Sequence, residues 1–66
     1  MDLYVGDTII SKKGNRYEAS NPLITIVWGV SVNDPDDGRW FEIADLTCTD
    51  EEEGIWQEAS EGEGKG

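Results

Sequence analysis

Hydrophobic and polar residues alternate along short stretches of this chain, which is typical of β-strands rather than helices. A β-branched run at residues 8–11 is followed by a tight-turn sequence at residues 12–15, where Gly14 is free to take a positive φ. Residues 16–19 then alternate polar and apolar. The two runs therefore predict a β-hairpin.

The longest apolar stretch, residues 23–32, predicts the longest strand, and the Asn21-Pro22 pair is expected to break the chain before it. Successive side chains of a strand point to opposite faces, so the stretch divides into two sets. We expect the core set to be Ile24, Ile26, Trp28, Val30 and Val32, and the other set to be Leu23, Thr25, Val27, Gly29 and Ser31. Gly29 indicates a bend or a bulge.

Residues 33–38 have the composition of a loop, and residues 39–43 predict the next strand. Its inward-facing residues are expected to be Phe41 and Ile43, and its outward-facing residues Trp40 and Glu42.

Residues 44–46 predict one helical turn, residues 47–49 an extended segment, and residues 55–56 a final short strand. No stretch predicts a helix of ten residues or more. Five short strands in under sixty residues must close on themselves to hide their edges, so the predicted fold is a small all-β barrel.

A single domain is expected at residues 1–57, because a chain of 66 residues holds one small core at most. Residues 58–66 predict a flexible acidic tail, since the end of the chain is rich in Gly and Glu and poor in apolar residues. No signal peptide or membrane-spanning stretch is visible. The single Cys48 fits a reducing cytoplasm, which is the host cytoplasm if a phage encodes the chain.

The layout of these elements resembles the SH3-like small barrels over about residues 5–57. The shared features are a Gly6-Asp7-Thr8 start, a hairpin, a long bent strand, an acidic hairpin loop, a Trp-Phe strand and a short helical turn before the last strands. The resemblance implies a five-stranded barrel that serves as a binding platform through its loops and exposed aromatics. Because the chain lacks the Ala-Leu-Tyr-Asp-Tyr signature of eukaryotic SH3 domains, binding of proline-rich peptides is not implied.

Charge divides the chain into two unlike halves. Residues 1–33 hold three acids and three bases, whereas residues 34–66 hold twelve acids and two bases and carry the whole net charge of −10. Lys and Arg clusters are absent, so direct binding of nucleic acid or an anionic membrane is not expected. The acidity either serves a basic partner or only keeps a small protein dissolved.

Few residues are suited to chemistry. Aligning Gly38 with the invariant glycine of a calcium loop places Pro35, which has no side-chain oxygen, at a ligand position. One Cys and no His are too few for zinc. A small barrel offers little room to enclose a substrate for a carboxylate pair such as Glu42 and Asp45, and Cys48 has no nearby base. We therefore expect no catalytic residue, metal or cofactor.

Acidic residues and one tryptophan form the candidate binding site. Trp40 is expected on the outer surface of its strand, where it is either an interface anchor or a satellite core residue covered by the acidic loop or by residues 55–56. The partner-binding candidates are Asp34, Asp36, Asp37, Trp40, Glu42, Asp45, Asp50, Glu51, Glu52 and Glu53, and Glu58 adds a further carboxylate.

Two functions follow from this reading. The first is a non-catalytic protein that imitates the charge of DNA and binds the basic face of a nucleic-acid-binding protein or enzyme, as do the small acidic inhibitors made by bacteriophages against host enzymes and defence systems, which it resembles. The second is an assembly module, such as a virion or complex subunit, held by strand addition at the edges of residues 4–5 and 23–32. Neutralising the loop carboxylates Asp34, Asp36 and Asp37 distinguishes the two functions. The DNA mimic should lose its partner, whereas the assembly module should be little affected.

Overall fold

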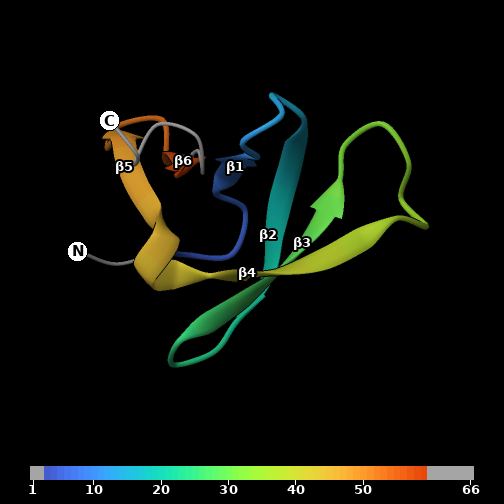
Figure 1. The fold of residues 1–66 in the computed structure, drawn as a ribbon, viewed down its shortest axis with the longest axis horizontal. Helices are drawn as coiled ribbons and strands as arrows, with labels where there is room; N and C mark the ends of the chain where they lie inside the picture. The colour runs from blue at the N-terminus through green and yellow to red at the C-terminus, as the bar shows by residue number, and fades with distance from the viewer. Residues whose placement is uncertain (1–2, 60–66) are drawn as a thin grey trace.

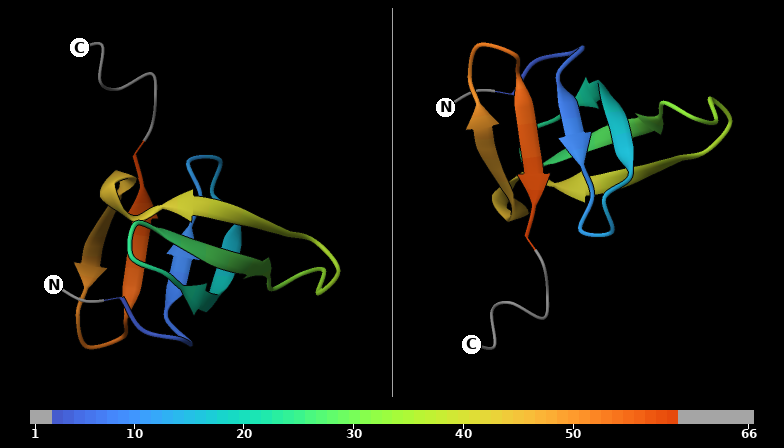
Figure 2. Two further views of the ribbon diagram at one scale, coloured as in Figure 1. Left: turned by 90° about the horizontal axis from the view of Figure 1, so that it is seen from below. Right: turned by 90° about the horizontal axis from the view of Figure 1, so that it is seen from above.

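The computed structural model describes residues 3–59 and confirms an all-β fold. Its strands form a single sheet, curled into a half-barrel, in the order β4-β3-β2-β1-β6-β5 (Figures 1 and 2). The elements are β1 (Thr8–Ile10), β2 (Arg16–Pro22), β3 (Ile26–Ser31), β4 (Gly38–Glu42), the 3₁₀ turn η1 (Ile43–Asp45), β5 (Leu46–Asp50) and β6 (Ile55–Glu58). The described residues thus contain six strands rather than five. None of their helical segments is long enough to cross a membrane.

The predicted first hairpin is confirmed. β1 and β2 pair antiparallel, with Ile9 opposite Tyr17. The connecting turn is closed by the Gly14 N–H, which donates to the carbonyl of Ser11 at 2.8 Å. Gly14 has a φ of 91°, a left-handed conformation that a side chain disfavours, so the glycine is required by the turn.

The Asn21-Pro22 pair does not break the chain as predicted, because β2 continues through both residues. The register of β2 against β3 shifts between Ala19 and Asn21, so the bulge lies in β2 and not at Gly29. This end of β2 extends past its pairing with β1, which stops at Glu18. A proline is tolerated there because no second neighbouring strand needs its N–H.

The predicted core face of the third strand is wrong. Val27 is fully buried and Gly29 is buried, whereas Trp28 is only half-buried and Ile24 is 95% exposed. The cause is the close approach of Phe41: a Cβ added at Gly29 would lie 2.8 Å from Phe41 Cε2. The space inside the sheet is already filled from β4, so β3 turns its smaller side chains inward.

The fourth strand and the last strands follow the prediction closely. Phe41 faces inward and is 1% exposed, while Trp40 faces outward. The helical turn begins one residue earlier than expected, so Ile43 lies in η1 and packs against the core from there. Residues 55–58 form β6, which pairs antiparallel with β5 and parallel with β1.

The core lies on the concave side of the curled sheet. Tyr17 and Phe41 meet there edge to face, with ring centroids 5.1 Å apart. The buried apolar residues are Ile9, Tyr17, Ala19, Val27, Phe41, Leu46 and Trp56. Because they come from all six strands, the core joins the whole sheet.

β4 and β5 are the two end strands of the sheet and are consecutive in the chain, joined by η1. Backbone hydrogen bonds fix this connection in place: the Ile43 N–H donates to the Thr25 carbonyl, and the Ala59 N–H to the Asp45 carbonyl, both at 2.9 Å.

Glu58, predicted to begin the tail, instead ends β6 and is buried. Residues 60–66 of the predicted tail lie outside the described residues.

Candidate interaction surfaces

All nine carboxylates of the predicted binding site belong to exposed residues, but they do not form one compact cluster. Asp34, Asp36 and Asp37 lie in the β3–β4 loop, and residues 50–53 lie at the β5–β6 turn. The ribbon views place this loop and this turn at opposite ends of the long axis of the protein, which measures 34 Å (Figures 1 and 2). We call them the loop group and the turn group.

The loop group is held in shape by its own backbone and side chains. Asp34 Oδ1 accepts a hydrogen bond from the Asp36 N–H at 3.1 Å, and the Asp37 carbonyl accepts one from the Ser31 N–H at 2.8 Å. Asp34 therefore stabilises the turn as well as carrying charge. Within residues 3–59, the side chains of Asp36 and Asp37 make no hydrogen bond or ion pair.

The turn group follows the same principle. Asp50 Oδ1 accepts a hydrogen bond from the Glu53 N–H at 3.1 Å, and Gly54 completes the turn with a φ of 67°. Glu51, Glu52 and Glu53 are all exposed. One acid thus shapes the turn, and the next three project charge from it.

Glu42 and Asp45 lie along the chain between the two groups. Glu42 ends β4 and Asp45 ends η1, and both are exposed. In chain order the acidic positions therefore run from the loop, through the end of β4 and η1, and past β5 to the turn, with no acid between Asp45 and Asp50. We call this path the acidic ridge.

Glu58 does not belong to the acidic ridge. It is 7% exposed, its Oε2 lies 3.1 Å from Arg39 Nη2, and its Oε1 accepts the Lys12 N–H at 3.0 Å. Asp7 is a second acid used by the fold, since its carboxylate accepts hydrogen bonds from Trp56 Nε1 at 3.0 Å and from the Tyr4 N–H at 3.1 Å. Both carboxylates hold the fold together and are not available to a partner.

Trp40 is exposed, and neither of the two covers considered for it is present. It is 46% exposed, and Trp56 is buried in the core. Its neighbour is Trp28, whose ring meets that of Trp40 edge to face with centroids 5.0 Å apart. Trp28 in turn lies over Gly38, because a Cβ added there would be 2.5 Å from Trp28 Cζ2.

The two tryptophans are part of an apolar surface whose β3 residues the sequence analysis assigned to the core. On the convex side of the sheet, Ile26, Trp28 and Val30 follow one another along β3 with Trp40 beside them. We call these four residues the outer apolar face. The alternation that divides β3 into two sets is correct, but the set that contains Gly29 faces inward, where Phe41 and Tyr17 leave no room for a Cβ at position 29.

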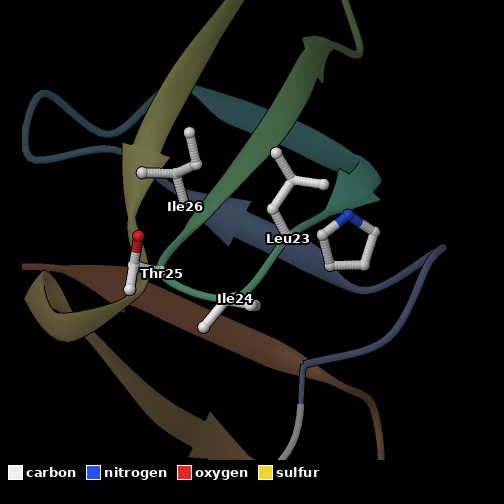
Figure 3. Close-up of a pocket in the computed structure, with 5 residues that line it drawn as sticks. Leu23, Ile24, Thr25 and Ile26 are labelled. Carbon is white, nitrogen blue, oxygen red and sulfur yellow. The ribbon is translucent and has the colours of Figure 1, made fainter.

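The β2–β3 hairpin ends in a second apolar feature next to this face. Leu23 and Ile24 are 50% and 95% exposed, and we call them the hairpin tip. Pro22, Leu23, Ile24, Thr25 and Ile26 line an open hollow of about 530 Å³ (Figure 3). The chain thus presents its most exposed hydrophobic side chain, among those described, at a bend.

The charges paired with the outer apolar face are carboxylates. Glu42 lies opposite Ile26 across β4 and β3, and Glu18 lies opposite Val30 across β2 and β3. A smaller hollow of about 220 Å³ beside Val30 is lined by Val5 and Glu18 among others. The surface therefore combines an apolar centre with acidic neighbours.

The strand-addition hypothesis predicted the wrong edges. β3 lies between β2 and β4 and is an interior strand, and residues 4–5 lie outside the strands. The end strands of the sheet are β4 and β5.

The described residues hold no group of three or more His, Cys, Asp or Glu placed to bind a metal ion. Cys48 is a free, half-buried thiol packed against the core. Comparison of the chain with protein-family models, curated proteins and solved structures gives no match. The surfaces described above are therefore the basis on which a function is inferred.

Proposed function

We propose that this protein is a non-catalytic acidic interaction protein that binds the basic face of a nucleic-acid-binding protein or enzyme by imitating DNA charge. The observation that carries the proposal is the acidic ridge, which runs from one end of the molecule to the other beside an exposed tryptophan. A small β-sheet scaffold of SH3-like layout, used as a binding platform, fits this role.

The number of charges supports the proposal. Seven of the nine carboxylates lie in the loop group and the turn group at opposite ends of the 34 Å axis, with Glu42 and Asp45 between them in the chain. A single strand of DNA carries one phosphate per about 3.4 Å, and a duplex one charge per about 1.7 Å of axis. Nine charges equal the phosphates on about 31 Å of one DNA strand, so the acidic ridge matches one phosphate backbone in total charge over its length, with the charge gathered at the two ends.

Trp40 is suited to supply the affinity that charge alone does not provide. Long-range attraction between exposed charges speeds association but contributes modest affinity in salt. An exposed tryptophan beside the charged path is a suitable anchor, because tryptophan is enriched among residues that dominate binding energy. We infer that Trp40 lies at the centre of the contact, between the loop group and Glu42.

Capture of partners from a bacterial lysate at low and high salt tests the proposal. Proteins retained at low salt should bind DNA themselves, and added duplex DNA should compete them away from the immobilised chain. The triple variant D34N/D36N/D37N should retain much less of the same proteins. Partners without affinity for nucleic acid, or retention that neither duplex DNA nor this variant reduces, would contradict DNA mimicry.

A further inference from the structure

The hairpin tip is apolar at a position where the fold itself gains nothing from it. The Leu23 N–H donates to the Ile26 carbonyl at 2.7 Å, so Ile24 and Thr25 form the bend. Bends of this kind favour Gly, Asn, Asp or Pro, whose side chains or backbones suit a turn. Ile24 is 95% exposed and packs against little of its own chain. A single exposed apolar residue is common on protein surfaces, but one that borders a larger apolar patch marks an interaction surface.

The hairpin tip is continuous with the outer apolar face. Ile26, Trp28 and Val30 alternate along the convex side of β3, Trp40 widens the surface at its middle, and the hairpin tip borders it at the Ile26 end. The four residue steps from Ile26 to Val30, at ~3.3 Å each, span about 13 Å, and the hairpin tip extends the strip beyond Ile26. An α-helix rises 1.5 Å per residue, so roughly nine residues cover the strand part of the strip, and a helix of about 13 residues also reaches the hairpin tip.

Charge decides which occupant suits this strip. Its paired neighbours Glu18 and Glu42 are acidic, and the whole chain carries a net charge of −10. A second copy of the chain would bring the same charge to the contact, and an anionic membrane would also be repelled. A segment with apolar side chains at its centre and Lys or Arg at its flanks matches both the strip and its surroundings.

We propose that the outer apolar face and the hairpin tip form a docking site for an amphipathic helix of a partner protein whose apolar side is flanked by Lys or Arg. The docking site rests on the proposed function in taking the partner to be basic and shares Trp40 and Glu42 with it, but its other residues, Ile24, Ile26, Trp28 and Val30, lie outside the acidic ridge. Ile24 is the apolar anchor at one end of the site, and the Trp28–Trp40 pair is the anchor at its middle.

A synthetic helical peptide of about 13 residues, with leucines along one side and lysines at its flanks, tests the docking site directly. Titrated into the ¹⁵N-labelled protein, it should shift the backbone amide signals of residues 23–30 and the indole N–H signals of Trp28 and Trp40. These shifts should persist at high salt, because apolar contact is not screened. Ile24→Ser should weaken peptide binding about tenfold, since burial of an isoleucine side chain is lost.

Ile24→Val is the matched control, because it keeps an apolar β-branched side chain, and it should bind the peptide nearly as well as the parent. Ile24 is exposed, so both variants should keep the amide spectrum of the folded protein. A peptide of the same pattern with Glu in place of Lys should bind much more weakly.

The other outcomes overturn the docking site. If the peptide shifts only the signals of the loop group and the turn group, and these shifts disappear at high salt, the docking site is contradicted. The acidic ridge would then be the surface that binds the peptide, through charge. If the Glu peptide binds as well as the Lys peptide, the inference that the partner segment is basic is contradicted. Concentration-dependent shifts of residues 23–30 without peptide would assign the strip to a second copy, and binding to zwitterionic vesicles would assign it to a lipid surface. The peptide could still shift the signals of the strip at high salt while duplex DNA fails to compete proteins away from the immobilised chain. That result would support the docking site and contradict the proposed DNA mimicry.

Discussion

Arg39 and Glu58 form an ion pair that joins β4 to β6 across the concave side of the sheet. Arg39 Nη2 lies 3.1 Å from Glu58 Oε2, and the Arg39 guanidinium lies over the Phe41 ring, 4.2 Å from its centroid. The second oxygen of Glu58 accepts the backbone N–H of Lys12. One carboxylate therefore connects β6 to the turn after β1 and to β4, a strand with which β6 does not pair.

Glu58→Gln should lower the free energy of unfolding by about 1–3 kcal/mol, because it removes the charge of a largely buried carboxylate and leaves the Arg39 guanidinium without its partner. The value lies toward the lower end because the Arg39 side chain is 40% exposed and water can solvate it. Chemical denaturation of the two proteins measures the difference. Glu42→Gln, which neutralises an exposed carboxylate on β4, the strand that also holds Arg39, should change stability by less than about 0.5 kcal/mol. Equal effects of the two substitutions would show that the ion pair contributes nothing.

Gly29 and Gly38 make room for aromatic rings on opposite sides of the sheet. Gly29→Ala should cost about 3 kcal/mol, because its Cβ would meet Phe41 in the packed core. Gly38→Ala should cost only about 1 kcal/mol, because Trp28 is half-buried and its ring can move toward solvent. Denaturation gives both costs, and tryptophan fluorescence should change in the folded Gly38→Ala variant. An unchanged emission spectrum together with an unchanged stability would contradict the placement of Trp28 over Gly38.

Added salt should stabilise the fold. The chain carries a net charge of −10, and the compact fold holds the acids of residues 3–59 in a smaller volume than the unfolded chain does. Screening at 0.2 M salt relative to 0.02 M should therefore raise the melting temperature, and the triple variant D34N/D36N/D37N should reduce the rise. Thermal denaturation at the two salt concentrations measures both. A melting temperature that falls with salt would show that attraction between opposite charges outweighs repulsion among the acids.

Local sequence signals predict much of this fold because the strands are bounded by clear turns. The hairpin of β1 and β2 depends on Gly14, and its conformation follows from that glycine. The strand at residues 55–58 stands out because Ile55 and Trp56 are the only large apolar residues of an otherwise polar end. The pairing of β6 with both β1 and β5 is a tertiary event that no local pattern contains.

The hydrophobic pattern of β3 does not determine which of its faces is buried. Both faces of the strand carry apolar residues, and hydrophobicity alone favours the set that contains Trp28. The structure reverses this choice because Phe41 occupies the space that a Cβ at Gly29 would need. Only the pairing of β3 with β4 makes that constraint visible, and the outer apolar face could not be predicted without it.

For the carboxylates, too, local sequence predicts exposure but not arrangement in space. Exposure of the loop group and the turn group follows from their polar, turn-forming sequences. Their separation along the long axis depends on the strands between them and could not be predicted. Glu58 is counted among the surface acids in the sequence analysis, whereas it is buried and paired with Arg39, which is 19 residues away in sequence.

The salt dependence of binding to a purified DNA-binding partner tests the central claim most directly. The logarithm of the association constant should fall steeply with the logarithm of salt concentration for the parent protein. The slope should be shallower both for D34N/D36N/D37N and for E51Q/E52Q/E53Q, because the two groups lie at opposite ends of one ridge. A parent slope near zero, or slopes that neither triple variant reduces, would contradict the claim that the acidic ridge is the binding surface.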